Sequence, residues 1–202
     1  MKTDWQRQMD DTLAGAHEKR LLLHCCCAPC AGWCITSVEQ RIKTTLFYYN
    51  PNIMPRAEYD KRRGELVKLV DAAGFNVGGI IEGEYDNDFF LSLAKGLEGE
   101  REGGERCRRC IAMRLEETAR RAAEGGFDYF ATTLTVSPHK DAEYINGAGA
   151  ILAEKYGVGY LPSDFKKKEG FKHTVELCRK YDIYRQNYCG CAFGGNAPDM
   201  TE

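Results

Sequence analysis

The chain has 202 residues, of which 43% are hydrophobic and 29% charged, and its formal net charge at pH 7 is −2. This length and apolar content are enough for one substantial core, so the fold does not need disulfide staples. The nearly balanced charge excludes a protein coated in positive charge but leaves a local basic face possible.

The first twenty residues, MKTDWQRQMDDTLAGAHEKR, are polar and mixed in charge. They lack the apolar stretch of a signal peptide or a membrane span, so we expect a cytoplasmic protein in which residues 1–19 form a polar N-terminal extension. In a reducing cytosol, ten cysteines indicate metal ligands or redox groups more readily than disulfides.

Short apolar runs alternate with helix-length stretches along the whole chain. The predicted strands are 21–26, 44–49, 77–81, 128–132 and 158–161, and the predicted helices are 30–41, 57–73, 107–124 and 141–156. This alternation is typical of βαβ units, whose crossovers place helices on both faces of a parallel sheet. We therefore expect one doubly wound α/β domain over residues 1–202, with a mostly parallel sheet and a helical C-terminal segment.

Two segments read as connections. The Gly- and Glu-rich stretch at 96–106 predicts a solvated loop or a lid, and residues 194–202 predict a flexible tail.

The first strand runs directly into a dense group of cysteines, LLLHCCCAPCAGWC. Doubly wound sheets bind ligands beyond the carboxyl ends of their strands, where the strand order reverses. Side chains alternate along an extended backbone, so Cys26 and Cys27 are expected to point apart, toward two neighbouring centres. Cys30 completes a CxxC motif whose proline fixes the turn into the next helix.

Four other residues that could bind a metal are more typical of buried packing or hydrogen bonding: Cys25, Cys34, Cys178 and His24.

Two further cysteine groups lie far along the chain. Cys107 and Cys110 fall in the first turn of a helix with an apolar stripe and a Gly-Gly stop, where the positive end of the helix dipole stabilises thiolates. Cys189 and Cys191 flank a glycine that lets the backbone curl around a ligand. With Cys26, Cys27 and Cys30 there are seven candidate metal ligands, more than the four that one zinc ion or one four-iron cluster uses. Either some are ordinary buried thiols or a second metal lies beside the first.

Several motifs together resemble the epoxyqueuosine reductases of the QueH type, and the resemblance extends along most of the chain. They are HCCCAPC (24–30), YNPNIMPRAEY (49–59), RCRRCIAMRL (106–115), ATTLTVSPHKD (131–141) and YRQNYCGCAF (184–193). Ile111 and His139 stand where the family pattern has aromatic residues, which affects substrate contacts rather than the proposed ligands.

The resemblance implies a fold similar to the adenine-nucleotide alpha-hydrolase-like domains and a reductase that removes the epoxide oxygen of epoxyqueuosine in tRNA. It also implies a [4Fe-4S] cluster and one additional mononuclear iron. As a hypothesis, Cys27, Cys107, Cys110 and one cysteine of the YCGC pair hold the cluster, while Cys26, Cys30 and the other face the second iron. The two electrons are expected from an external low-potential donor, because the chain has no GxGxxG fingerprint.

Residues near these motifs are candidates for substrate contacts and proton transfer. Tyr188, His139 and Asp141 are candidate proton donors. The stretch from Lys166 to Arg185 is basic, which is typical of a solvated helix face and also of a surface that binds phosphates in a salt-sensitive way. The resemblance implies tRNA as the partner, and neither DNA nor a membrane. Tyr181, Tyr184 and Tyr188 are candidates for base stacking. The predicted substrate-binding residues are Asn50, Asn52, Glu58, Tyr59, Lys166, Lys167, Lys168, Lys172 and Arg185.

Two other functions are compatible with parts of this sequence. A zinc-stapled RNA-binding module without redox activity would use the same cysteines and basic stretch, but the protein would be colourless. A nucleotide-activating tRNA-modifying enzyme would need a Gly- and Ser-rich phosphate loop after the first strand, where this chain has CCCAPCAG.

Overall fold

The computed structural model describes residues 3–194, which form one five-stranded sheet covered by seven α-helices. In chain order the elements are α1 (Trp5–Leu13), β1 (Arg20–His24), α2 (Ala28–Val38), β2 (Lys43–Tyr48), α3 (Arg56–Ala73), β3 (Ile80–Glu82), α4 (Asn87–Ala94), α5 (Glu105–Glu124), β4 (Tyr129–Thr132), the 3-10 turn η1 (Thr133–Val136), α6 (Ala142–Tyr156), β5 (Gly159–Tyr160) and α7 (Gly170–Lys180). The predicted tail at 194–202 lies outside the described residues, apart from its first.

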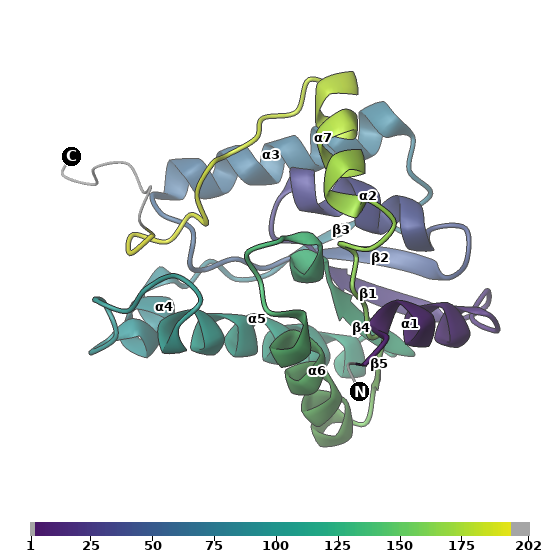
Figure 1. Cartoon of the computed structure of the whole chain (residues 1–202), viewed down its shortest axis with the longest axis horizontal. Helices are drawn as coiled ribbons and strands as arrows, with labels where there is room; N and C mark the ends of the chain where they lie inside the picture. Colours follow the sequence, from purple (N-terminus) through teal and green to yellow (C-terminus); the bar gives the residue numbers. More distant parts are fainter. Residues whose placement is uncertain (1–2, 195–202) are drawn as a thin grey trace.

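All strand pairs are parallel, in the order β3-β2-β1-β4-β5. Helices α2, α3 and α7 lie on one face of the sheet, and α4, α5 and α6 lie on the other (Figure 1). This confirms the predicted doubly wound α/β fold, with a sheet that is entirely parallel. The strand order reverses between β1 and β4, so the cysteine run after β1 begins at the switch point where such sheets bind ligands.

The central strand divides its side chains between two cores. Leu21 and Leu23 pack in the core on the α2 and α3 side, whereas Leu22 packs with α5 and α6 on the other side. Helices cover both faces, so the strands have near-continuous apolar sequences rather than alternating ones. On α5, the predicted stripe through Leu115 and Ala119 is fully buried in the second core.

The N-terminal segment differs from the predicted polar extension. Residues 5–13 form α1, whose first turn is capped by the Asp4 side chain, and the helix buries Met9 and Leu13 in the core with α2 and α3. Met9 and Leu13 are the only buried residues of α1, and the other positions are polar or partly exposed, so the sequence shows no apolar helical period there. Helix α4 was not expected either, because its eight residues are too few to establish a period.

Among the described residues, none of the helices combines the length and the apolar character needed to cross a membrane.

Candidate metal and substrate site

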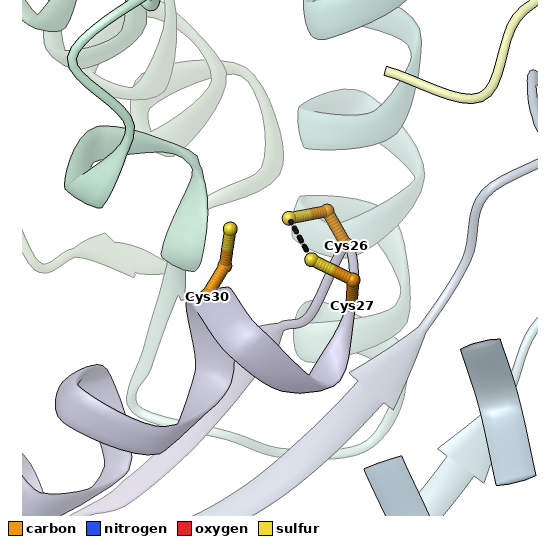
Figure 2. Close-up of side chains that lie close together, drawn as sticks. All are labelled: Cys26, Cys27 and Cys30. Carbon is orange, nitrogen blue, oxygen red and sulfur yellow. Dashed lines mark hydrogen bonds between the residues drawn. The ribbon is translucent and has the colours of Figure 1, made fainter. Parts of the chain in front are cut away.

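Three cysteines converge where β1 passes into α2. The sulfurs of Cys26, Cys27 and Cys30 all lie within 4.8 Å of one another, and Figure 2 shows them pointing into one space. The Sγ atoms of Cys26 and Cys27 are 3.7 Å apart. The expectation that these two side chains point apart was therefore wrong. Strand β1 ends at His24 and Cys27 is already the N-cap of α2, so strand alternation does not apply.

Hydrogen bonding within this group favours one shared thiolate. Contacts from Cys27 and Cys30 hold the pKa of Cys26 well below its usual value. The hydrogen bonds that Cys27 and Cys30 make with Cys26 raise their own pKa values. The amino end of α2 adds a positive dipole to the group. Three sulfurs at this spacing are able to bind a single soft metal ion.

The other four candidate ligands line a second, smaller pocket. Cys107 and Cys110 come from the first turns of α5, and Cys189 and Cys191 come from the chain after α7. This grouping differs from the sequence hypothesis, in which Cys27 shares a centre with Cys107 and Cys110. The amino end of α5 meets the chain after α7 instead, and Cys27 remains at the start of α2.

The segment that carries Cys189 and Cys191, yellow in Figure 1, is held in place from both faces of the sheet. Arg62 of α3 donates to the carbonyl of Cys189 at 3.0 Å, and Arg106 of α5 donates to the carbonyl of Phe193 at 3.2 Å. Gly190 between the two cysteines has φ 103°, a conformation that favours glycine. This is the backbone curl expected from the YCGC motif.

Two cations lie at the junction of the two groups. Arg114, Lys140 and Asn52 line both the four-cysteine pocket and a larger cavity that contains the three-cysteine group, as does Cys189. Arg114 is only 3% exposed, and its Nε donates to the carbonyl of Cys110 at 3.2 Å. Lys140 Nζ lies 3.7 Å from the Cys189 sulfur. A hydrogen bond from Cys191, with Lys140 and Arg114 nearby, lowers the pKa of Cys189 to about 5.

Sequence reasoning missed both cations. Arg114 was detectable, since it follows Cys110 by four residues and therefore lies on the same face of α5. Lys140 has no such local signal, because the loop after η1 brings it to Cys189 from a distant part of the chain.

The larger cavity has a volume of about 410 Å³ and contains some of the predicted substrate residues. Asn50, Asn52 and Arg185 line it. Glu58 does not line the cavity itself. It accepts a hydrogen bond at 2.7 Å from the Nε of Arg62, which does line it. Tyr59 is instead fully buried in the first core, with its hydroxyl bonded to Glu82, so its position is structural.

The predicted basic stretch contributes little to this cavity. Lys166 pairs with Asp164, Lys168 with Asp10 and Lys172 with Glu169, so three of its charges are locally neutralised. Within residues 3–194, none of the four predicted lysines, Lys167 included, lines the cavity.

The candidate proton donors divide in the same way. Tyr188 and His139 line the cavity. Asp141 does not, because its carboxylate caps α6 by accepting from the backbone N–H of Tyr144 at 3.2 Å. Helix capping is therefore the role that the structure gives to Asp141.

The buried imidazole of His24 predicts a pH-dependent stability. Its Nε2 lies 3.0 Å from the carbonyl of Tyr49 and donates to it, which leaves Nδ1 to accept from the Thr132 hydroxyl at 2.9 Å. Complete burial, reinforced by the charge of Arg114, lowers the pKa of His24 from 6.5 to about 4. The unfolded chain therefore binds an extra proton as the pH falls, and about 3 kcal/mol of stability is lost between pH 6.5 and 4.

Urea unfolding of the reduced, chelator-treated protein across this pH range tests the prediction. The His24→Gln variant should show a flatter profile than the wild type. Parallel profiles for the two proteins would contradict it.

Comparison with known proteins places these features in a family context. A family model described as epoxyqueuosine reductase QueH matches residues 21–197. The chain is 43% identical over 176 residues to epoxyqueuosine reductase QueH of Streptococcus pyogenes serotype M1, covering 86% of this chain and 69% of that protein. It is 38% identical over 176 residues to the protein of the same name from Thermotoga maritima, covering 86% and 88% of the two chains.

Proposed function

The chain belongs to the epoxyqueuosine reductase QueH family and is an oxidoreductase, and from that premise we propose that it reduces epoxyqueuosine in tRNA to queuosine through iron bound by its cysteines. The observation that carries the proposal is the division of seven cysteines into groups of three and four, which share a cationic junction beside one cavity. Groups of this size and chemistry suit two adjacent iron centres.

The two groups differ in what they would hold. Four thiols around one small pocket match the ligand number of a [4Fe-4S] cluster, so we assign the cluster to Cys107, Cys110, Cys189 and Cys191. The three-cysteine group would hold an additional iron, and it lines the larger cavity, where that iron would act as a Lewis acid toward the epoxide oxygen. When bound, these centres supply electrons from an external low-potential donor, and removal of an epoxide oxygen as water takes two electrons and two protons.

The residues of the chain bind and orient the substrate in this scheme. Arg185 lines the cavity with its side chain exposed, where it can contact an RNA phosphate. Tyr188 lines the same cavity, and burial with the nearby Glu58 raises the pKa of its hydroxyl, which therefore keeps its proton at neutral pH. Tyr188 is therefore our candidate proton donor. Arg62 holds it by a cation–π contact at 4.8 Å.

Metal analysis and one assay test the proposal together. Protein purified without oxygen is expected to be brown, with about four to five iron atoms and about four sulfides per chain. With a strong reductant, it is expected to remove one oxygen atom from tRNA that contains epoxyqueuosine, as seen by mass analysis of the nucleosides. Colourless protein that contains only zinc would contradict the reductase, as would unchanged substrate with fully iron-loaded protein.

A further inference from the structure

Most of the buried polar atoms without a hydrogen-bond partner in the described chain belong to residues that line the larger cavity. Among residues 3–194, seven buried side-chain nitrogen or oxygen atoms have no hydrogen-bond partner. Four of the seven belong to residues that line this cavity: Asn50 Oδ1, Asn52 Oδ1, Thr174 Oγ1 and Gln186 Oε1. Buried polar atoms without partners destabilise a fold, so their concentration at one place indicates a ligand with hydrogen-bond donors.

The four atoms belong to two parts of the wall. Asn50 and Asn52 follow β2 at the cysteine side, where Asn50 Nδ2 donates to the carbonyl of Cys25 at 2.9 Å and Asn52 also lines the four-cysteine pocket. Thr174 lies on α7 and Gln186 on the chain that follows it. This second pair comes from α7 and the chain after it rather than from the loop after β2, so it forms a different part of the cavity wall, with Gln186 three residues before Cys189.

An exposed aromatic ring accompanies this second pair. Phe171 lines the same cavity and remains 47% exposed. It precedes Thr174 by three residues, so the two side chains share one face of α7. An exposed ring at a cavity edge is an apolar surface that lacks a partner within the described chain.

The backbone before Phe171 is tightly constrained. Lys168 and Glu169 have φ 53° and 56°, a left-handed conformation that costs energy for residues with side chains. Gly170 has no room for a side chain, because a Cβ there would lie 1.8 Å from the carbonyl oxygen of Phe165. The backbone position from which the Phe171 side chain extends is therefore set by the fold, at the expense of local strain.

We propose that Phe171, Thr174 and Gln186 form a seat for an unpaired nucleobase of the RNA substrate. The base stacks on the Phe171 ring, and N–H groups on its edge donate to Thr174 Oγ1 and Gln186 Oε1 after these two side chains rotate and turn their buried oxygens into the cavity that both residues line. The neighbouring Arg185 contacts the phosphate of the same nucleotide. This seat rests on the proposed function and extends it, since it binds a different nucleotide from the one whose reacting group lies at the cysteines. Flat rings with polar edges are the groups that such a surface recognises in RNA.

The test uses the full-length, iron-loaded protein and tRNA that contains epoxyqueuosine. Phe171→Leu keeps an apolar side chain but removes the aromatic face, whereas Phe171→Tyr keeps the face. Phe89→Leu is the matched control, because Phe89 is 46% exposed on α4 and does not line the cavity. Fluorescence anisotropy at fixed salt gives the Kd for tRNA, and turnover gives KM and kcat.

Phe171→Leu is expected to raise Kd and KM about 10-fold, the scale of one lost base stack, with iron and sulfide contents unchanged. Thr174→Val should raise both constants several-fold, and Phe171→Tyr should restore binding to near wild-type strength. Phe89→Leu should behave as wild type. Wild-type binding by Phe171→Leu, in a protein whose wild type binds and converts tRNA, would overturn the seat alone. Wild-type protein that neither binds nor converts tRNA would overturn the proposed function and the seat together.

Discussion

Replacing Cys107 with alanine is expected to remove the brown colour, the sulfide and more than about 99% of the reductase activity. Mutation of a residue that only supports a metal ligand typically lowers metal affinity or activity by about 10- to 100-fold, and loss of a direct ligand lowers them further. Cys107 lines the pocket that holds Cys110, Cys189 and Cys191, so its loss leaves three thiols for a cluster that uses four. Iron, sulfide and visible absorption measured beside turnover check the result.

The informative comparison is Cys27→Ala, because the sequence hypothesis and the structure place Cys27 in different groups. From its position with Cys26 and Cys30, Cys27→Ala is expected to lose about one iron and most activity while keeping its sulfide and colour. Cys25→Ala is the matched control, since Cys25 is fully buried in the first core and lines neither pocket. Loss of the sulfide in Cys27→Ala would contradict the grouping.

Replacing Arg114 with methionine is expected to destabilise the iron-loaded protein by about 3 kcal/mol more than the metal-free protein. Burial opposes the charge of Arg114, yet the nearby Cys110 and Cys189 raise its pKa, so its guanidinium remains charged beside both groups. Bound iron keeps the cysteines as thiolates, and removing the only fully buried cation shared by both pockets in the described chain leaves that negative charge uncompensated. In the metal-free protein the raised pKa values of Cys27, Cys30, Cys110 and Cys191 keep these four thiols protonated, so Arg114→Met costs less stability.

Anaerobic denaturant unfolding of the loaded and the chelator-treated protein measures this difference, together with iron content. Arg109→Met is the control, because Arg109 lies on the same helix but is half exposed and paired with Glu105. Equal losses of stability in the two forms of Arg114→Met would show that Arg114 contributes packing rather than charge.

Local patterns explain which predictions were confirmed. The buried stripe of α5 repeats at helical spacing and is followed by a Gly-Gly stop, and the apolar run of β1 indicates a strand covered on both faces. Elements with few buried residues left no such pattern, which is why α1 and α4 were missed. Asp141 caps α6, a role that was not predicted, because a carboxylate next to a motif has the same sequence signature whether it caps a helix or moves a proton.

The doubly wound α/β fold, the seven candidate ligands and the resemblance to a reductase family were all predictable, because periodicity, residue type and motif spacing are properties of short stretches of chain. The folded chain was needed to see which cysteines line the same pocket, where Arg114 and Lys140 lie, and that Phe171, Thr174 and Gln186 share one cavity wall. These facts depend on where the amino end of α5, the loop after η1 and the chain after α7 meet beside β1. Packing on the two faces of the sheet brings these segments together. A local sequence pattern contains no information about which distant segment will pack beside it.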